Sequence, residues 1–460
     1  MSSFEPPRPP PLDVIQAFGR SIFRGRNSAA SKLLKNYQVT PLHKTRGTRC
    51  WTFHVRDKLS AHEGIVVRAL KVVEANKEES HPYFPEFWSL IGTLKHLEKR
   101  QCDLDDELKA MIPKIIAYDL KVDNPIRAPY IVMDYIPGTP ADAVIKSGAD
   151  PQIITRFYTA LAKFVYQLHN IQEGFTYTGA FGTAKAPTKL EKNADIDGNL
   201  VFEADNERYF RTAELTYRDY FGMVTEFWTW PRPGTTNSPG SDNPQIARGA
   251  CYLADAVFGD ILIRGGSTDV GSVKQFALCH PNLSLDRILV DQEGNIKGIL
   301  GWMYARVEPG FVGLGRLPPS ISESPITTPR YPKDTCEPTP PIFSPDGRLI
   351  GSLEYAGILG GLLYPDKLDS DRAEAMNSIK LSALTWDMLK SEEGRVSLMK
   401  SMLEEYICES EDEARQILLE DTVLDEDNYE HSESITPREL KKLRSVAQKM
   451  MAAAKKTNTT

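Results

Sequence analysis

The sequence lacks the features that define several large classes of protein. Its six cysteines are scattered, with no CxxC pair and no metal-ligand spacing relative to histidine. This pattern argues against a disulfide framework and favours reduced thiols. No apolar run reaches transmembrane length, and the stretch MSSFEPPRPPPLDV has proline where a signal peptide has an apolar core. We therefore expect a soluble, cytoplasmic protein with no membrane partner.

The chain also lacks an excess of positive charge. Its formal net charge is −7, which argues against a general nucleic-acid-binding surface. Hydrophobic residues make up 41% and charged residues 25%, which are ordinary values for a globular protein. A chain of 460 residues exceeds what one core usually supports, so we expect two lobes with extensions.

A glycine-rich phosphate loop is missing as well. Gly47 is the only glycine in the first predicted hairpin, and Gly313-Leu314-Gly315 begins no strand-to-helix phosphate loop. Gly47 is kept as a candidate nucleotide contact because it lies in the turn of that hairpin.

Residues 37–136 have the pattern of a small, mostly antiparallel lobe. Alternating and β-branched runs predict five strands, and apolar residues at helical spacing predict one helix after the third strand. The strands are expected at 37–40, 50–55, 64–73, 112–119 and 128–135, and the helix at 80–100.

Most of the remaining chain is predicted to be helical. Residues 174–206 are expected to be loop-like and 310–345 to be an extended surface segment. Helices are expected at 13–34, 151–171, 210–230, 245–263, 353–363, 369–390, 394–408, 411–419 and 437–456. The expected domains are a proline-rich tail and helix (1–36), a sheet lobe (37–136), a helical lobe (137–420), and an acidic segment followed by a basic helix (421–460).

The stretch from Phe276 to Trp302 has the pattern of a loop followed by a β-hairpin. Cys279-His280-Pro281-Asn282 turns the chain, Ile288-Leu289-Val290 is a predicted strand, and residues 296–300 are predicted to return as its partner. Polar residues at both ends of such a hairpin are typical of kinase-like phosphoryl-transfer centres.

Two segments make this resemblance specific. Residues 124–139, NPIRAPYIVMDYIPGT, and residues 276–302 are similar to segments of the fungal branch of the aminoglycoside phosphotransferase-like family. The resemblance covers about residues 37–310. It implies an α+β, bilobal protein-kinase-like fold, with the hairpin region 276–303 as a catalytic loop in the helical lobe.

The same resemblance assigns three catalytic places, and all three are changed. The family has an aspartate base where this chain has Asn282, an asparagine metal ligand at Arg287, and an aspartate metal ligand at Gly301. Asparagine cannot act as a base, arginine repels a metal ion, and glycine offers no side-chain ligand. The catalytic loop is therefore expected to be degenerate, with no intact catalytic residue and no metal site.

Neighbouring polar residues do not restore the chemistry. Asp286 is one position out of register, and Asp291 fits a turn-forming aspartate better than a displaced metal ligand. His280 can be read as a base, but a hydrogen bond to the loop backbone is the favoured interpretation.

The nucleotide-binding positions implied by the resemblance are less altered. Arg68 occupies the basic position of the third strand, with Lys71 as a rival that depends on the register. Glu86 is the expected ion-pair partner on the following helix, and a solvated pair is the equally weighted alternative. Met133, Asp134 and Tyr135 are expected to form the hinge whose backbone binds an adenine.

Three hypotheses follow. The leading one is a catalytically impaired pseudokinase that binds a nucleotide or a protein partner. The second is an active ATP-dependent phosphotransferase for a small hydroxylated molecule, with Arg287 clamping phosphate in place of a metal ion. The third is a structural interaction protein with a closed cleft. The resemblance allows ATP as a cofactor, whereas the changed ligand positions argue against Mg²⁺.

Overall fold

The structure is a computed structural model. It describes residues 9–26, 37–42, 50–57, 64–70, 85–100, 103–145, 150–171, 179–182, 199–201, 244–264, 276–280, 283–303, 305–316, 348–389, 392–420 and 435–451. The chain forms two compact units. The first comprises Met1–Lys146, Gly179–Glu203 and His280–Arg306, and the second comprises Ser147–Thr178, Ala204–Cys279 and Val307–Thr460.

The first unit is built on a five-stranded sheet with the order β1-β2-β3-β5-β4. Every neighbouring pair in it is antiparallel. Its strands are β1 (Tyr37–Pro41), β2 (Cys50–Asp57), β3 (Gly64–Leu70), β4 (Ile115–Asp119) and β5 (Tyr130–Asp134). The predicted five-stranded, antiparallel arrangement is confirmed, and residues 71–73 of the predicted third strand lie outside the described residues.

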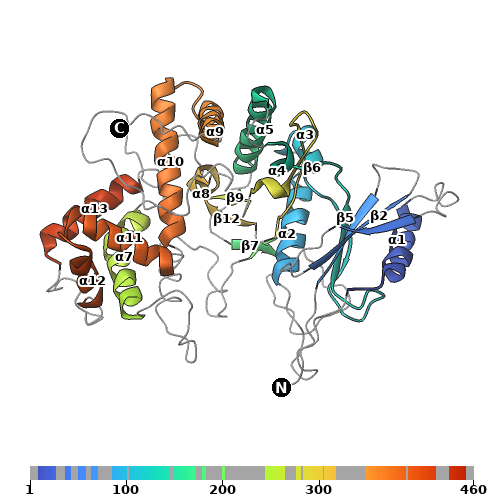
Figure 1. Cartoon of the computed structure of the whole chain (residues 1–460), viewed down its shortest axis with the longest axis horizontal. Helices are drawn as coiled ribbons and strands as arrows, with labels where there is room; N and C mark the ends of the chain where they lie inside the picture. The colour runs from blue at the N-terminus through green and yellow to red at the C-terminus, as the bar shows by residue number, and fades with distance from the viewer. Residues whose placement is uncertain are drawn as a thin grey trace, which may run out of the picture. The chain divides into compact units, whose positions relative to one another are not determined.

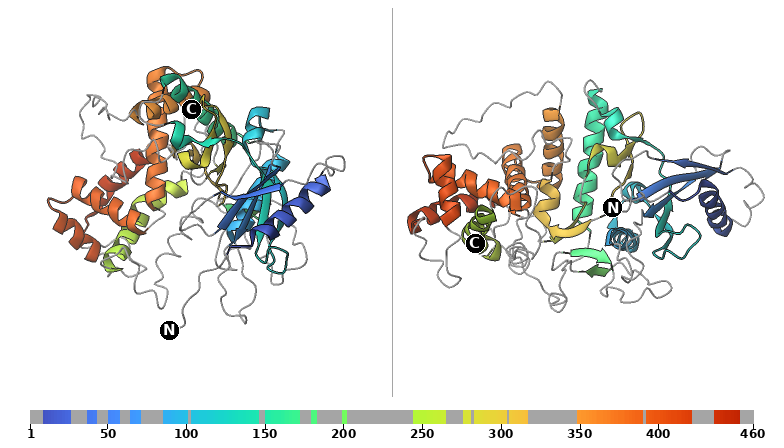
Figure 2. Two further views of the ribbon diagram at one scale, coloured as in Figure 1. Left: turned by 45° about the vertical axis from the view of Figure 1, so that its right-hand side comes forward. Right: turned by 60° about the horizontal axis from the view of Figure 1, so that its bottom comes forward.

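One face of this sheet carries the apolar core of the unit. Alternate residues of β2, β3 and β5, among them Val55, Val67 and Val132, are fully buried because successive side chains of a strand point to opposite faces. Helix α1 (Leu12–Arg26) places Ile15 in the same cluster, and Figure 2 shows α1 alongside the sheet from two directions. The helix predicted at 13–34 is described only to Arg26.

The other face of the sheet lies toward α2 (Pro85–Lys99), in which Phe87, Ile91 and Leu94 are buried at helical spacing as predicted. Lys95 of α2 donates a hydrogen bond of 3.1 Å to the Tyr118 hydroxyl of β4. A short helix that the sequence pattern did not predict, α3 (Asp106–Met111), precedes β4.

The catalytic-loop region belongs to the first unit. Here η4 (Leu285–Arg287) leads into the predicted hairpin of β10 (Ile288–Val290) and β11 (Ile296–Ile299), and β10 also pairs with β6 (Thr139–Pro140). The expected boundaries grouped residues 276–303 with the helical lobe. The strand pairing with β6, which precedes α4 (Ala141–Val144), ties residues 280–306 to the sheet-containing unit instead. A second hairpin, β7 (Gly179–Gly182) and β8 (Asn199–Val201), lies in the segment expected to be loop-like.

The second unit is mainly helical. Figure 1 shows its long helix α10 in orange. The helices are α5 (Pro151–His169), α7 (Pro244–Arg264), α8 (Gly310–Gly315), α9 (Arg348–Leu363), α10 (Asp369–Leu389), α11 (Glu392–Tyr406), α12 (Glu411–Glu420) and α13 (Pro437–Met450), and the strands are β9 (Phe276–Cys279) and β12 (Arg306–Pro309). The helix predicted at 210–230 lies outside the described residues.

Helix α8 corrects one prediction, because residues 310–315 were expected to be extended. Phe311, Val312 and Leu314 are buried, and α8 packs against α10. Apolar burial therefore outweighs the low helix propensity of the glycines in this segment.

A buried ion-pair network stabilises the second unit around Arg316, directly after α8. Its guanidinium binds Glu308 of β12 at 2.8 Å and Asp387 of α10 at 2.5 Å. The Glu308 side chain is only 2% exposed, so its charge depends on this partner.

The predicted α+β class is confirmed: an antiparallel sheet occupies the N-terminal part and helices occupy the C-terminal part. Within the described residues, no helix is both long and apolar enough to cross a membrane.

Candidate functional site

The loop before the hairpin is held in place by backbone hydrogen bonds. Arg287 N–H donates to the Ser284 carbonyl at 2.9 Å, and Leu300 N–H donates to the Arg287 carbonyl at 2.8 Å. His280 Nε2 lies 3.0 Å from the Leu300 carbonyl. These contacts join the loop at 280, the turn at 287 and the end of β11 into one rigid corner.

His280 supports this corner. Its ring is 6% exposed and meets the Trp302 ring edge-on, with 4.8 Å between centroids. Burial is the main cause that lowers the pKa of His280 to about 3; the Leu300 hydrogen bond opposes it and the nearby charge of Arg287 adds to it. The ring is therefore neutral, and because a carbonyl only accepts, Nε2 carries its proton. This geometry agrees with the interpretation favoured from the sequence, in which His280 makes a hydrogen bond to the loop backbone.

Arg287 and Gly301, two of the three changed positions, lie in direct contact. Gly301 has φ of +87°, in the left-handed region that glycine adopts readily. A Cβ built on Gly301 would lie 2.8 Å from Arg287 Cδ and 3.1 Å from Arg287 Nη1. The arginine side chain thus occupies the space that a side chain at position 301 would need.

Arg287 as a whole residue is partly exposed. Among the residues that the structure describes, it has neither an ion pair nor a side-chain hydrogen bond. The neighbouring Asp286 is exposed and does not pair with it. The corner therefore contains a cation without a compensating anion.

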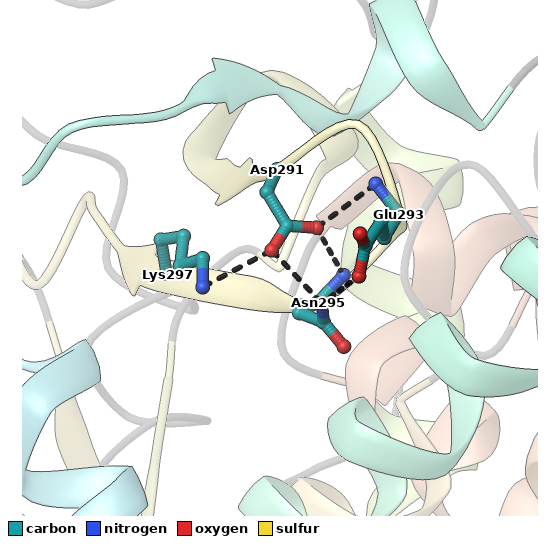
Figure 3. Close-up of polar contacts among 4 residues, drawn as sticks. All are labelled: Asp291, Glu293, Asn295 and Lys297. Carbon is teal, nitrogen blue, oxygen red and sulfur yellow. Dashed lines mark hydrogen bonds and ion pairs between the residues drawn. The ribbon is translucent and has the colours of Figure 1, made fainter.

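Asp291, at the far end of the hairpin, is fully engaged in its turn (Figure 3). Its carboxylate accepts hydrogen bonds from the backbone of Glu293 at 3.0 Å and of Asn295 at 2.9 Å, and it pairs with Lys297 at 3.0 Å. Burial alone would raise its pKa, but these bonds together lower the pKa to about 2. This arrangement fits a turn-forming aspartate, whose oxygens are already used.

The residues present do not fit a magnesium ion. Mg²⁺ requires oxygen ligands in octahedral geometry, usually including carboxylates. Here a guanidinium lies over a glycine at the two described positions where the resemblance expects ligands. Across the described ranges, no group of three or more histidine, cysteine, aspartate or glutamate residues can hold a metal ion. The third changed position, Asn282, lies outside these ranges.

The predicted nucleotide contacts are placed on β3 and β5. Arg68 faces Thr52 of β2 and Ile131 of β5 in the strand register, so these residues share one face of the sheet. Arg68 is half-buried, and among the described residues it too has no ion pair. No described contact joins Arg68 to Arg287. The side chain of Glu86, the rival Lys71 and the turn glycine Gly47 lie outside the described residues.

Two backbone N–H groups of the expected hinge are engaged in hydrogen bonds. Asp134 N–H donates to the Lys114 carbonyl at 3.0 Å, and Tyr135 N–H donates to the Gly64 carbonyl at 3.1 Å. Met133 is buried within the β3-β5-β4 ladder. These two N–H groups are engaged within the sheet-containing unit, and adenine binding by the backbone of residues 133–135 stays a prediction.

His54 is a site feature that the sequence reading missed. Its ring stacks on Tyr135 with 3.7 Å between centroids and 16° between planes. A Cβ built on Gly64 would lie 2.5 Å from His54 Nε2, so the histidine needs a glycine on the neighbouring strand. The sequence did contain a signal for it, because the alternation of β2 places His54 on the same face of the sheet as Arg68.

The comparisons with known proteins give structural likeness only. No protein-family model matches the chain, and no curated protein matches it. A putative aminoglycoside phosphotransferase from Ralstonia eutropha is similar at 11% identity, over 96% of this chain and 98% of that chain, with a TM-score of 0.42. An ethanolamine kinase from Plasmodium vivax is similar at 10% identity, over 94% and 86%, with a TM-score of 0.41. An aminoglycoside phosphotransferase bound to streptomycin and ATP is similar at 11% identity, over 80% and 89%, with a TM-score of 0.38. Likeness at these scores assigns this chain no substrate and no chemistry.

Proposed function

We propose that this chain is a degenerate kinase-like protein that no longer performs magnesium-dependent phosphoryl transfer and acts as a binding module. The observation that carries the proposal is the contact between Arg287 and Gly301. Two positions that the family resemblance assigns to metal ligands hold a cation packed against a residue without a side chain. The arginine at position 287 also excludes a ligand at position 301, because a carboxylate there would clash with the Arg287 side chain.

The surrounding residues support the same conclusion. His280 is neutral and donates its ring N–H to a backbone carbonyl, so that nitrogen is not a base. Asp291 has its oxygens committed to the turn. Loss of a general base alone lowers a rate by about 10² to 10⁴-fold, and the lost metal ligands add to this effect.

A closed structural module is the second candidate. The stacked pair of His54 and Tyr135 and the committed donors at residues 134 and 135 favour it, because they leave an adenine few partners at that edge of the sheet. This candidate differs from the first in binding no phosphate-bearing ligand.

The test is an assay of ADP formation by the full chain with ATP and Mg²⁺. Ethanolamine and streptomycin, the small molecules named for the structural neighbours, serve as trial hydroxyl substrates, and Asn282→Ala serves as the matched variant. We expect ADP formation equal to that of Asn282→Ala and independent of the trial substrate. Substrate-dependent ADP formation that Asn282→Ala abolishes would refute the proposal.

A further inference from the structure

The Arg287 guanidinium is the least compensated charge of the described hairpin region. Arg287 is partly exposed and has no anionic partner among the described residues, so its guanidinium is open to an anion from outside the chain. The other hairpin cation, Lys297, is 47% exposed and pairs with Asp291 at 3.0 Å. The contrast between these two cations of one hairpin points to a missing anion at Arg287.

The backbone that carries the Arg287 side chain is held in a defined place. The backbone of Arg287 is fixed by hydrogen bonds to Ser284 and Leu300, and its side chain lies against Gly301. A pre-organised guanidinium loses less entropy when it binds an anion, and its fork of donors matches phosphate oxygens. The structure thus presents a ready donor group.

No described neighbour neutralises this charge. His280 is uncharged, Asp286 is exposed and unpaired with the arginine, and the oxygens of Asp291 are taken by its own turn. An incoming anion therefore meets a guanidinium that pairs with no carboxylate among the described residues.

We infer that Arg287 anchors a phosphate-binding site that works without a divalent metal ion. The site takes a diphosphate or triphosphate group, carried by a nucleotide or by inorganic polyphosphate. Recognition runs through the phosphates rather than the base, because the backbone donors of Asp134 and Tyr135 are already used. The inference deepens the proposed function, since it names the ligand class of the same degenerate site. It rests on the proposed function, which holds that the site has no metal ion.

The experiment is calorimetric titration of the full chain in EDTA with three probes: inorganic tripolyphosphate, ATP and adenosine. Tripolyphosphate and ATP are expected to bind, and adenosine is not. Arg287→Gln keeps a side chain of similar reach but removes the charge. It is expected to weaken binding by about tenfold to a hundredfold, the range for a hydrogen bond to a charged group. Equal affinity for tripolyphosphate and ATP indicates a polyphosphate site, and tighter ATP binding indicates a nucleotide site.

Lys297→Gln is the matched control, because it removes one positive charge from the same hairpin at a cation that is already paired. Its affinity should stay within about twofold of the parent, since Lys297 is 47% exposed and already paired with Asp291.

The inference is overturned by no binding in EDTA, by equal effects of Arg287→Gln and Lys297→Gln, or by binding of adenosine as tight as ATP. These results are separate from the ADP-formation assay. Magnesium-dependent turnover with retained binding in EDTA refutes the proposed function alone. Absent turnover with no binding in EDTA refutes this inference alone.

Discussion

Replacement of Gly301 by alanine tests the contact on which the site depends. Two costs are expected. A non-glycine residue at φ +87° costs about 1 to 2 kcal/mol. The new Cβ also lies 2.8 Å from Arg287 Cδ, well inside the ordinary separation of carbon atoms, so the arginine must move. We estimate this second cost at about 1 kcal/mol, because a flexible side chain can shift.

A double-mutant cycle separates the two costs. In an Arg287→Ala background the clash is gone, so Gly301→Ala should cost only the backbone term and show a coupling of about 1 kcal/mol. Gly294→Ala is the control, because Gly294 has φ of +82° in the turn of the same hairpin. It should cost the same amount with and without Arg287.

Urea unfolding of the parent, the three variants of the cycle and the two Gly294→Ala controls gives the free energies of unfolding. Equal destabilisation by Gly301→Ala in both backgrounds would refute the reasoning, because it would mean that Arg287 does not lie on Gly301. A coupling for Gly294→Ala as large as that for Gly301→Ala would refute it as well.

Three further predictions concern charge. His280 is held neutral with a pKa of about 3, whereas the unfolded chain binds a proton near pH 6.5, so stability should fall as pH drops between these values. His280→Gln should reduce the slope of stability against pH by one proton in urea titrations from pH 7 to 4.5. Asp291→Asn should lower stability by about 1 kcal/mol at pH 7, a value discounted for partial exposure, and the difference from the parent should shrink below pH 4 because the folded pKa is about 2. Arg316→Met should destabilise the helical unit by about 3 to 5 kcal/mol, because it removes the cation that pairs with the buried Glu308, and a loss below 1 kcal/mol in thermal unfolding would contradict this.

Much of the sheet-containing unit could be predicted because its strands are half-buried. Alternation over residues 50–55 and the β-branched run from residue 64 reflect one buried face, and the structure has β2 and β3 there. Helix α3 was missed because a helix of six residues is too short to show a periodic pattern. Helix α8 was missed because its glycines suggested an extended segment, whereas burial against α10 decides its conformation.

The site was predictable in its positions but not in its contacts. Residues 287 and 301 were named from the family resemblance of the stretch around the hairpin. The Arg287 side chain fills the space beside Gly301. This contact depends on the β10-β11 register and on the positive φ of Gly301, and no local sequence pattern shows either. The hydrogen bonds donated by the backbone of residues 134 and 135 were also not predictable locally, because their acceptors, Lys114 and Gly64, are distant in sequence.

The most direct test of the central claim is the affinity of the full chain for ATP measured first in EDTA and then in excess Mg²⁺. The account predicts binding in EDTA that is unchanged or weaker with Mg²⁺, because the ion neutralises the phosphates that Arg287 would contact. ATP binding that appears only with Mg²⁺ would contradict it.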